Sequence, residues 1–136
     1  MRIYLAARYS RREELLGYAK ILEGLGHKIT STWIDGHHET RPNIDHVATD
    51  LERGDWAEED LNDLARCDAI VAFTNQPNGY GRERGGYHVE FGIALGMHKR
   101  LIVVGPRVNV FHCLITVEQY DDFLGLLLQL RVEVTA

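Results

Sequence analysis

The sequence has only two cysteines and no apolar run long enough to cross a bilayer. Cys67 and Cys113 cannot build the disulfide framework of a small secreted protein, and their spacing matches no structural zinc site. The first residues lead straight into a predicted strand rather than into a signal peptide. These absences favour a cytoplasmic protein whose thiols are reduced, with no membrane partner.

An excess of positive charge is also lacking. The chain carries 15 basic and 20 acidic residues, and its formal net charge of −5 argues against a nucleic-acid binder held by a broad basic face. A P-loop motif is absent, and so is a G-x-G-x-x-G motif after the first predicted strand. No internal repeat or linker divides the 136 residues, so we expect 1–136 to form a single domain.

The region 68–104 has the clearest pattern of secondary structure, and the rest of the chain is interpreted relative to it. Apolar runs at 69–73 and 101–104 predict two buried strands. Between them lie a glycine-rich loop and a segment, 87–97, whose apolar residues have helical spacing. A strand, loop, helix and strand in this order favour parallel strands joined by a right-handed crossover.

The flanking segments continue this alternation of strands and helices, which predicts a three-layer α/β domain with four strands and a possible fifth. Ser10 and Glu13 have the spacing of a capping box for the first helix. The segment 34–55 lacks periodicity, although part of it, about 45–53, could be helical. The other expected elements are strands at 2–7 and 28–33 (the latter at the sheet edge), helices at 11–25 and 56–66, a short apolar piece at 110–115, and a last helix beginning at Thr116 or Val117.

Two acidic residues are candidates for catalysis. Glu90 follows the glycine-rich loop, in what we expect to be the first turn of a helix. A helix N-terminus keeps a carboxylate ionised and apolar neighbours exclude water, which would suit a nucleophile. Glu is, however, common in first helical turns without any such role. Asp60 lies on the preceding helix and would reach the carboxyl edge of the sheet only if that helix began there.

Arginines are concentrated in the loops that should meet at the carboxyl edge of the sheet, where ligands of open parallel sheets bind. Any one of them could be a solvated charge or pair with a nearby glutamate. A group converging on one edge instead predicts an anionic ligand, held by guanidinium groups and the amides that open the first helix. The six are Arg8, Arg11, Arg12, Arg82, Arg84 and Arg107.

Seven histidines could suggest a metal site, above all the run His37-His38-Glu39 with His46. No two of these have the i, i+4 spacing that places ligands on one helical face, so we expect neither a metal nor another cofactor. Trp33 and Trp56 flank this segment. We interpret them as packing residues, either of which could stack on a base.

Three stretches together resemble the nucleoside 2-deoxyribosyltransferase family, which includes a branch of nucleoside 5′-monophosphate N-glycosidases. They are I-Y-L-A-A in the first strand, E-D-L-N-D-L-A-R-C-D-A-I-V-A-F before the loop, and G-G-Y-H-V-E-F-G-I-A-L-G-M-H-K-R after it. The resemblance spans nearly the whole chain. It implies a flavodoxin-like, Rossmann-like three-layer α/β domain with a five-stranded parallel sheet.

The resemblance also implies roles for individual residues. Glu90 falls on the family's nucleophile, Tyr4 on the tyrosine that orients it, and Asp60 on the aspartate that contacts the base. Asn109 falls on an asparagine lent by a neighbouring subunit, which implies a homodimer or higher homo-oligomer. With the anion-binding loops, the expected substrate-binding set is Ala6, Arg8, Ser10, Arg11, Arg82, Arg84, Gly86 and Asn109.

Two departures from the family bear on the substrate. The second aspartate of the transferases has no counterpart, because Arg84 stands six positions before Glu90. The serine of the glycosidase branch is missing too, although arginines could replace it in binding phosphate.

We therefore predict an enzyme that cleaves the N-glycosidic bond of a nucleoside 5′-monophosphate or nucleoside through a covalent glycosyl-Glu90 intermediate, by hydrolysis or base exchange. One alternative is a non-catalytic nucleotide-sensing module on the same fold. Another is a phosphoribohydrolase of the lysine-decarboxylase-like type, whose P-G-G-x-G-T pattern is absent here.

Overall fold

The computed structural model describes residues 1–38, 48–74 and 85–135. Five parallel strands form one sheet in the order β2-β1-β3-β4-β5. The predicted five-stranded parallel sheet is therefore confirmed. The strands are β1 (Arg2–Ala6), β2 (Lys28–Ile29), β3 (Ala69–Phe73), β4 (Arg100–Val104) and β5 (Val117–Tyr120).

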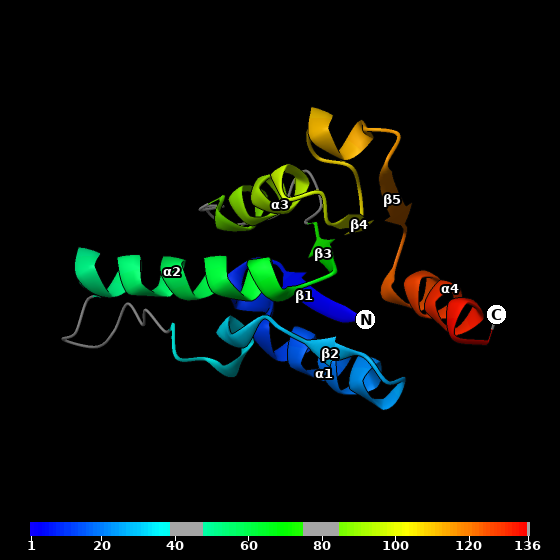
Figure 1. Cartoon of the computed structure of the whole chain (residues 1–136), viewed down its shortest axis with the longest axis horizontal. Helices are drawn as coiled ribbons and strands as arrows, with labels where there is room; N and C mark the ends of the chain where they lie inside the picture. The colour runs from blue at the N-terminus through cyan, green and yellow to red at the C-terminus, as the bar shows by residue number, and fades with distance from the viewer. Residues whose placement is uncertain (39–47, 75–84, 136) are drawn as a thin grey trace.

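Helices cover both faces of this sheet, which gives the predicted three layers (Figure 1). Helices α1 (Arg12–Gly24) and α4 (Phe123–Thr135) lie on one face, where Tyr18 of α1 stacks on Phe123 of α4 with ring centroids 4.0 Å apart. Helices α2 (Asp50–Arg66) and α3 (Gly86–Gly96) lie on the other face. In the described ranges, no helix combines the length and apolar character needed to span a membrane.

The neighbouring strands β1 and β3 are covered on both faces, and β3 is buried along its whole length. From β1 the chain crosses to β2 on one side, and from β3 it crosses to β4 on the other. The connections after β1 and β3 thus leave in opposite directions, which opens a crevice beyond the carboxyl ends of these two strands. The functional residues are expected at that crevice.

The edge position predicted for 28–33 is right, but the strand is shorter than predicted. Only Lys28 and Ile29 form β2. Beyond them the chain turns into a 3-10 helix, η2 (Thr32–Asp35), because the buried Asp63 carboxylate of α2 accepts a hydrogen bond from the Thr32 amide at 2.9 Å. A side chain of α2 thus replaces the sheet partner that this segment lacks.

The last helix begins later than predicted. Val117–Tyr120, assigned from the sequence to a helix, is the fifth strand, paired along β4. The apolar piece before it forms a 3-10 helix, η3 (Val110–Cys113). Helix α4 starts at Phe123, just after Asp122, whose side chain accepts a hydrogen bond from the Gly125 amide at 2.9 Å. An acceptor at this position satisfies an amide of the first turn, so it favours a start there.

The helix before β3 is also longer than predicted. Instead of beginning at Trp56, α2 runs without a break from Asp50, where Thr49 and Glu52 form a capping box. The capping box predicted at Ser10 is not formed, because Tyr9–Arg11 makes a short 3-10 helix, η1, that leads directly into α1. With 17 residues, α2 spans about 25 Å, so its first turns project past the sheet.

Candidate active site

A pocket of about 400 Å³ lies beyond the carboxyl ends of β1 and β3, within the size range of small-molecule sites. Its walls come from the connection after β1, the segment after β2, and the facing sides of α2 and α3. It is lined by Ala7, Arg8, Tyr9, Ser10, Trp33, His38, Asp60, Gly85, Gly86, Tyr87 and Glu90.

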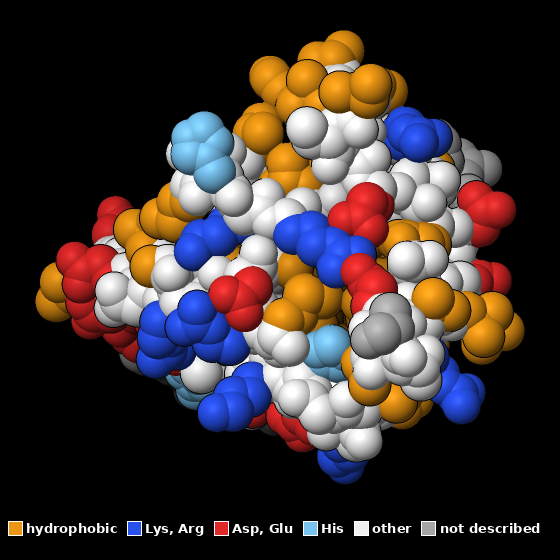
Figure 2. Space-filling model, turned by 45° about the vertical axis from the view of Figure 1, so that its right-hand side comes forward, with side chains coloured by type: hydrophobic (Ala, Val, Ile, Leu, Met, Phe, Trp, Pro, Cys, Tyr) orange, Lys and Arg blue, Asp and Glu red, His pale blue; other side chains and the backbone are white. Residues whose placement is uncertain are grey.

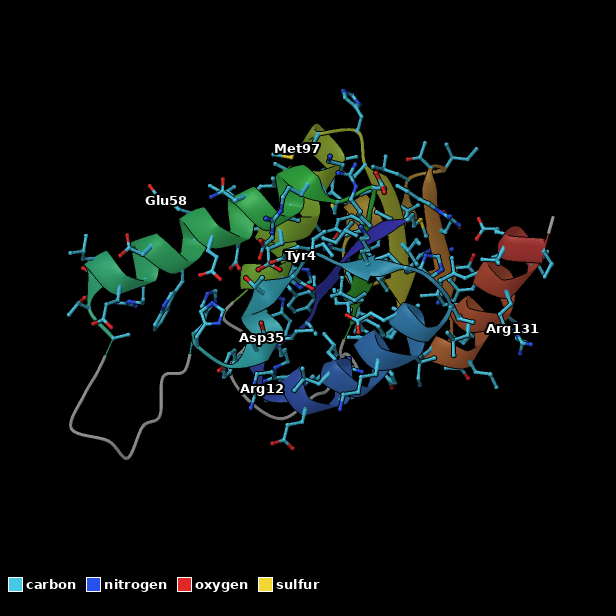
Figure 3. The ribbon with its side chains drawn as sticks, turned by 60° about the horizontal axis from the view of Figure 1, so that its bottom comes forward. Tyr4, Arg12, Asp35, Glu58, Met97 and Arg131 are labelled. Carbon is cyan, nitrogen blue, oxygen red and sulfur yellow. The ribbon has the colours of Figure 1, made fainter. Side chains whose placement is uncertain are left out.

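Tyr4, in the middle of β1, lies below this pocket and is fully buried (Figure 3). Its hydroxyl interacts with the carboxyl groups of Glu90 and Asp60, which belong to different helices. Within the described residues, the Tyr4 hydroxyl does not meet the distance and angle criteria of a hydrogen bond to either carboxyl group. Burial and the two negative charges raise the pKa of the Tyr4 hydroxyl, so it stays protonated and can only donate to a carboxylate. The structure thus brings these three predicted residues together, and their catalytic roles stay a prediction.

Glu90 does not lie in the first turn of its helix as predicted. Helix α3 begins at Gly86, after Gly85 in a left-handed conformation, so Glu90 is the fifth helical residue. Its carboxyl group therefore lies one turn beyond the free amides, over the sheet. Burial and the charge of Asp60 raise its pKa to about 8, against a smaller opposing effect of Tyr4. The prediction that the helix N-terminus keeps this carboxylate ionised is wrong.

Asp60 reaches the pocket although its helix does not begin at the sheet edge. Because α2 overshoots the sheet, a residue in the second half of the helix is level with the crevice. Burial, together with the charges of Asp63 and Glu59, raises the pKa of Asp60 to about 7. The charge of Asp60 is also one cause of the raised pKa of Glu90, so the two groups titrate as a coupled pair. With pKa values of about 7 and about 8, the pair keeps at least one proton at neutral pH, and Glu90 is its more basic member.

The predicted arginines do not all converge on this pocket. Arg8 lines it together with Ser10. Arg11 instead pairs with Glu14 at 2.8 Å on the surface of α1, which is the ordinary ion pair that the sequence left open. Arg12 donates to the Ile34 carbonyl oxygen at 3.1 Å.

Arg107 is exposed after β4, and Arg82 and Arg84 lie outside the described residues. Of the arginines predicted to bind an anion, Arg8 is thus the one that the described pocket contains.

The remaining predicted binding residues differ in position. Gly86 lines the pocket, whereas Ala6 is buried at the end of β1 and lies beneath it. Asn109 caps η3, where its side-chain oxygen accepts hydrogen bonds from the amides of Phe111 and His112 at 2.9 and 3.2 Å. It does not line the pocket of its own chain.

Several lining residues were missed or assigned to packing. The Trp33 ring borders the pocket while its Nε1 donates to the Leu5 carbonyl oxygen at 2.8 Å, and Tyr9 lies 6.0 Å from it, centroid to centroid. Tyr87 and His38 complete the walls. Trp33 and His38 follow the carboxyl end of β2, so the rule that selected the arginine-bearing loops could also have selected them.

His37 and His38, which the sequence did not predict to bind a metal, lie close to a third potential metal ligand. His37 and His38 lie next to Glu59 of α2, and these three are the described residues whose ligand atoms come within 4.8 Å of one another. The prediction that they form no metal site rested on spacing within one segment. Such spacing says nothing about a ligand that the fold brings from another helix.

Comparison with known proteins identifies the fold. No protein-family model matches the chain, and a search of curated proteins found no match. Among solved structures, the chain is similar to the Clostridium botulinum CMP N-glycosidase BcmB, with a TM-score of 0.62 over 97% of this chain and 99% of that one. The two chains share one fold. At 20% sequence identity, the likeness shows the flavodoxin-like architecture alone.

Proposed function

We propose that this protein is an N-glycosidase that cleaves the bond between base and sugar in a nucleoside 5′-monophosphate or nucleoside. The observation that carries the proposal is the meeting of Tyr4, Asp60 and Glu90 at one pocket, with two carboxyl groups whose pKa values are both raised. Perturbed carboxyl pairs in a cleft are typical of catalytic sites. The structural neighbour BcmB is a CMP N-glycosidase, which supports the same reaction class here.

The proposed chemistry uses one proton of the pair, in the form in which Asp60 holds it and Glu90 is ionised. Glu90 has the higher pKa, about 8 against about 7 for Asp60, but the two values are close enough for this form to be populated. The Glu90 carboxylate attacks C1′ and forms a glycosyl ester, while the C1′–N bond breaks and its electron pair goes to the base. Asp60 gives its proton to the departing base. Water then attacks C1′, Asp60 accepts the water's proton, and Glu90 leaves as a carboxylate. A second base in place of water would give base exchange. Tyr4 orients the Glu90 carboxylate throughout.

A panel of nucleosides and their 5′-monophosphates, assayed for free base by chromatography, tests the proposal. We expect base release by the wild-type protein, and mass spectrometry of the quenched reaction should detect a glycosyl adduct on Glu90. Adding a second free base distinguishes base exchange from hydrolysis. Nucleotide binding without any base release would contradict the proposal and favour the sensing module.

Arg8 and Ser10 are the proposed phosphate ligands. They lie on the wall formed by the connection after β1, and a guanidinium is well suited to a phosphate dianion. Arg8→Ala should lower kcat/KM for a monophosphate by roughly tenfold or more, since a charge-assisted contact is worth about 1.5–3 kcal/mol. The value for the matching nucleoside should hardly change. Arg107→Ala, at an exposed position outside the pocket, is the control. An equal loss for both substrates would remove Arg8 from phosphate binding.

We further propose that the protein is a homodimer whose sites are shared. Apolar side chains of η3 and its flanks are exposed, with Val110 at 77% and Ile115 at 101%, and they gather at the top of the space-filling view (Figure 2). A contiguous apolar surface of this kind favours a protein partner. Within α4, Leu126 and Leu130 are buried, but Leu124 and Leu128 remain exposed.

Hybrid subunits test this arrangement. Asn109, which lies beside the apolar surface of η3 and outside its own pocket, would then serve the partner's pocket. Mixing Glu90→Ala with Asn109→Ala subunits should restore part of the activity that each variant lacks alone. A fully active monomer in light scattering would contradict the proposal.

A cytoplasmic location is also part of the proposal. Cys67 is buried and Cys113 is exposed, and both are free thiols. Free cysteines favour a reducing compartment.

A further inference from the structure

Two consecutive histidines and a glutamate from another element form a cluster at the edge of the pocket. His37 and His38 follow η2, and Glu59 projects from α2. The distance from His37 Nε2 to Glu59 Oε1 is 2.5 Å, and that from His38 Nε2 to Glu59 Oε2 is 3.3 Å. One nitrogen or oxygen atom from each side chain lies within 4.8 Å of the other two.

These separations suit a bound transition metal. With bonds of about 2.0–2.1 Å to nitrogen and oxygen, the ligand atoms of a tetrahedral ion lie roughly 3.3–3.4 Å apart. Small adjustments of the side chains would therefore place an ion between them. Two imidazoles and one carboxylate favour Zn²⁺ and its neighbours over Mg²⁺ or Ca²⁺, which prefer oxygen ligands.

The surrounding structure already holds two of the three ligands in place. The His38 side chain is only 8% exposed, and its ring stacks on Trp56 with centroids 5.2 Å apart. The Thr32 hydroxyl lies 2.5 Å from Glu59 Oε1 and 2.7 Å from Asp63 Oδ2, so it holds the Glu59 carboxylate from the side of η2. Contacts of this kind orient ligands in metal sites.

The chain direction also favours the cluster. Gly36, with a φ of +94°, ends η2 in a left-handed conformation and turns the chain so that both following imidazoles approach α2. A side chain is strained at such a φ, so glycine suits the turn that presents the histidines.

We propose that His37, His38 and Glu59 bind one divalent transition-metal ion of the Zn²⁺ class and so tie the segment after β2 to α2. Three protein ligands leave a fourth position for water or a ligand atom. Because His38 also lines the pocket, with its Nδ1 4.0 Å from Asp60 Oδ1, the ion would fix the pocket wall beside the catalytic pair. This inference does not depend on the proposed glycosidase activity.

Metal titration of the untagged, chelator-treated protein tests the site. Competition with a chromophoric Zn²⁺ indicator should show a single high-affinity ion per chain, and Co²⁺ should give the absorption spectrum of a tetrahedral nitrogen and oxygen site. His37→Ala and Glu59→Gln should each weaken Zn²⁺ affinity by about 100-fold or more, since even outer-shell changes cost roughly 10–100-fold. Zn²⁺ should raise the Tm of the wild type but not of His37→Ala.

The matched control is His98→Asn, which removes an exposed imidazole after α3 and suits the positive φ of that position. It should bind Zn²⁺ as the wild type does. The His37 side chain is 43% exposed, so His37→Ala should fold normally, which circular dichroism verifies. Absence of binding in the wild type, or equal affinity in the wild type and both ligand variants, would overturn the proposal and leave ordinary histidine–glutamate hydrogen bonds. Base release is not a readout, so this result is independent of the proposed activity.

Discussion

Glu59 and Asp60 are consecutive on α2, yet they hold protons in opposite ways. Hydrogen bonds from Thr32 and the two histidines lower the pKa of Glu59 to about 2. Burial and neighbouring negative charges raise the pKa of Asp60 to about 7. Successive helical residues point about 100° apart, so the two carboxyl groups meet different neighbours. The surroundings, rather than the residue type or its place in the helix, decide which carboxylate carries a proton.

Glu90 belongs with Asp60 in this comparison. The carboxyl groups of Glu90 and Asp60 are buried, have few hydrogen-bond donors nearby, and lie close to another negative charge. Ionisation of either group therefore lowers the stability of the fold. Glu59 lies where donors are plentiful, so its ionised form stabilises the fold. One side of α2 thus holds a carboxyl group that keeps its proton near neutral pH, and the other holds a fixed negative charge.

The largest expected effect comes from removing the nucleophile. Glu90→Gln should lower base release by roughly 10³-fold or more, because a neutral amide cannot form the glycosyl ester. Free base measured by chromatography is the readout. The control is Glu58→Gln, an exposed residue on the outer side of α2, which should keep normal activity (Figure 3). Near-normal turnover by Glu90→Gln would show that the nucleophile is assigned wrongly.

Removing the proton donor should have a smaller effect that depends on the substrate. Asp60→Asn should slow cleavage by roughly 10²–10³-fold for bases that are poor leaving groups and by less for good ones, because general acid catalysis matters most when the departing nitrogen is basic. The loss of the Asp60 charge should also lower the pKa of Glu90, and the acid limb of the pH–rate profile should move to lower pH. Equal slowing for all bases would remove Asp60 from the proton transfer.

Stability should respond to pH with opposite signs on the two sides of the helix. The folded-state pKa of Glu90 is about 8, above its unfolded value, so wild-type stability falls as pH rises from about 4.5 to 8. Glu90→Gln lacks this loss and should be more stable than the wild type at pH 9, by roughly 1–3 kcal/mol after allowance for the shared proton. At pH 4 the two should be nearly equal.

Glu59→Gln should behave in the opposite way. The folded-state pKa of Glu59 is about 2, so its contribution is present above pH 4.5 and is lost as pH falls towards 2. The variant should be destabilised by about 1 kcal/mol at pH 7, a value reduced for solvent screening because the side chain is 35% exposed. Urea unfolding at pH 3, 7 and 9 with a chelator present checks both signs. Destabilisation of Glu90→Gln at pH 9 would contradict the comparison.

The layer order could be predicted because its signals are local. Buried runs such as Ala69–Phe73 have few alternatives to a central strand. The resemblance to a family pointed to Tyr4, Asp60 and Glu90, which the fold brings to one pocket, while their roles stay a prediction. Element ends were less accessible, since they depend on tertiary contacts. Val117–Tyr120 is a strand because β4 offers it a partner, and β2 stops early because Asp63 captures Thr32.

Charge partners were the hardest features to predict. The i, i+3 spacing allowed Arg11 to pair with Glu14 but did not exclude the pocket, whereas nothing in the sequence indicates that Glu59 meets two histidines 21 and 22 positions earlier. The raised pKa of Glu90 likewise depends on Asp60, which the fold brings from another helix. Pairings of this kind are set by three-dimensional distances of a few ångströms, which spacing along the chain does not encode.

The placement of the proposed catalytic trio on regular elements has an evolutionary consequence. Tyr4, Asp60 and Glu90 stand on β1, α2 and α3, whereas Arg8, Ser10 and His38 stand in the segments that follow strands. Connecting segments accept insertions and substitutions far more readily than the strands and helices that they join. Descendants of this chain can therefore acquire new substrate preferences through their loops while the residues proposed to break the bond stay unchanged, so selectivity and reactivity would be inherited as separable traits.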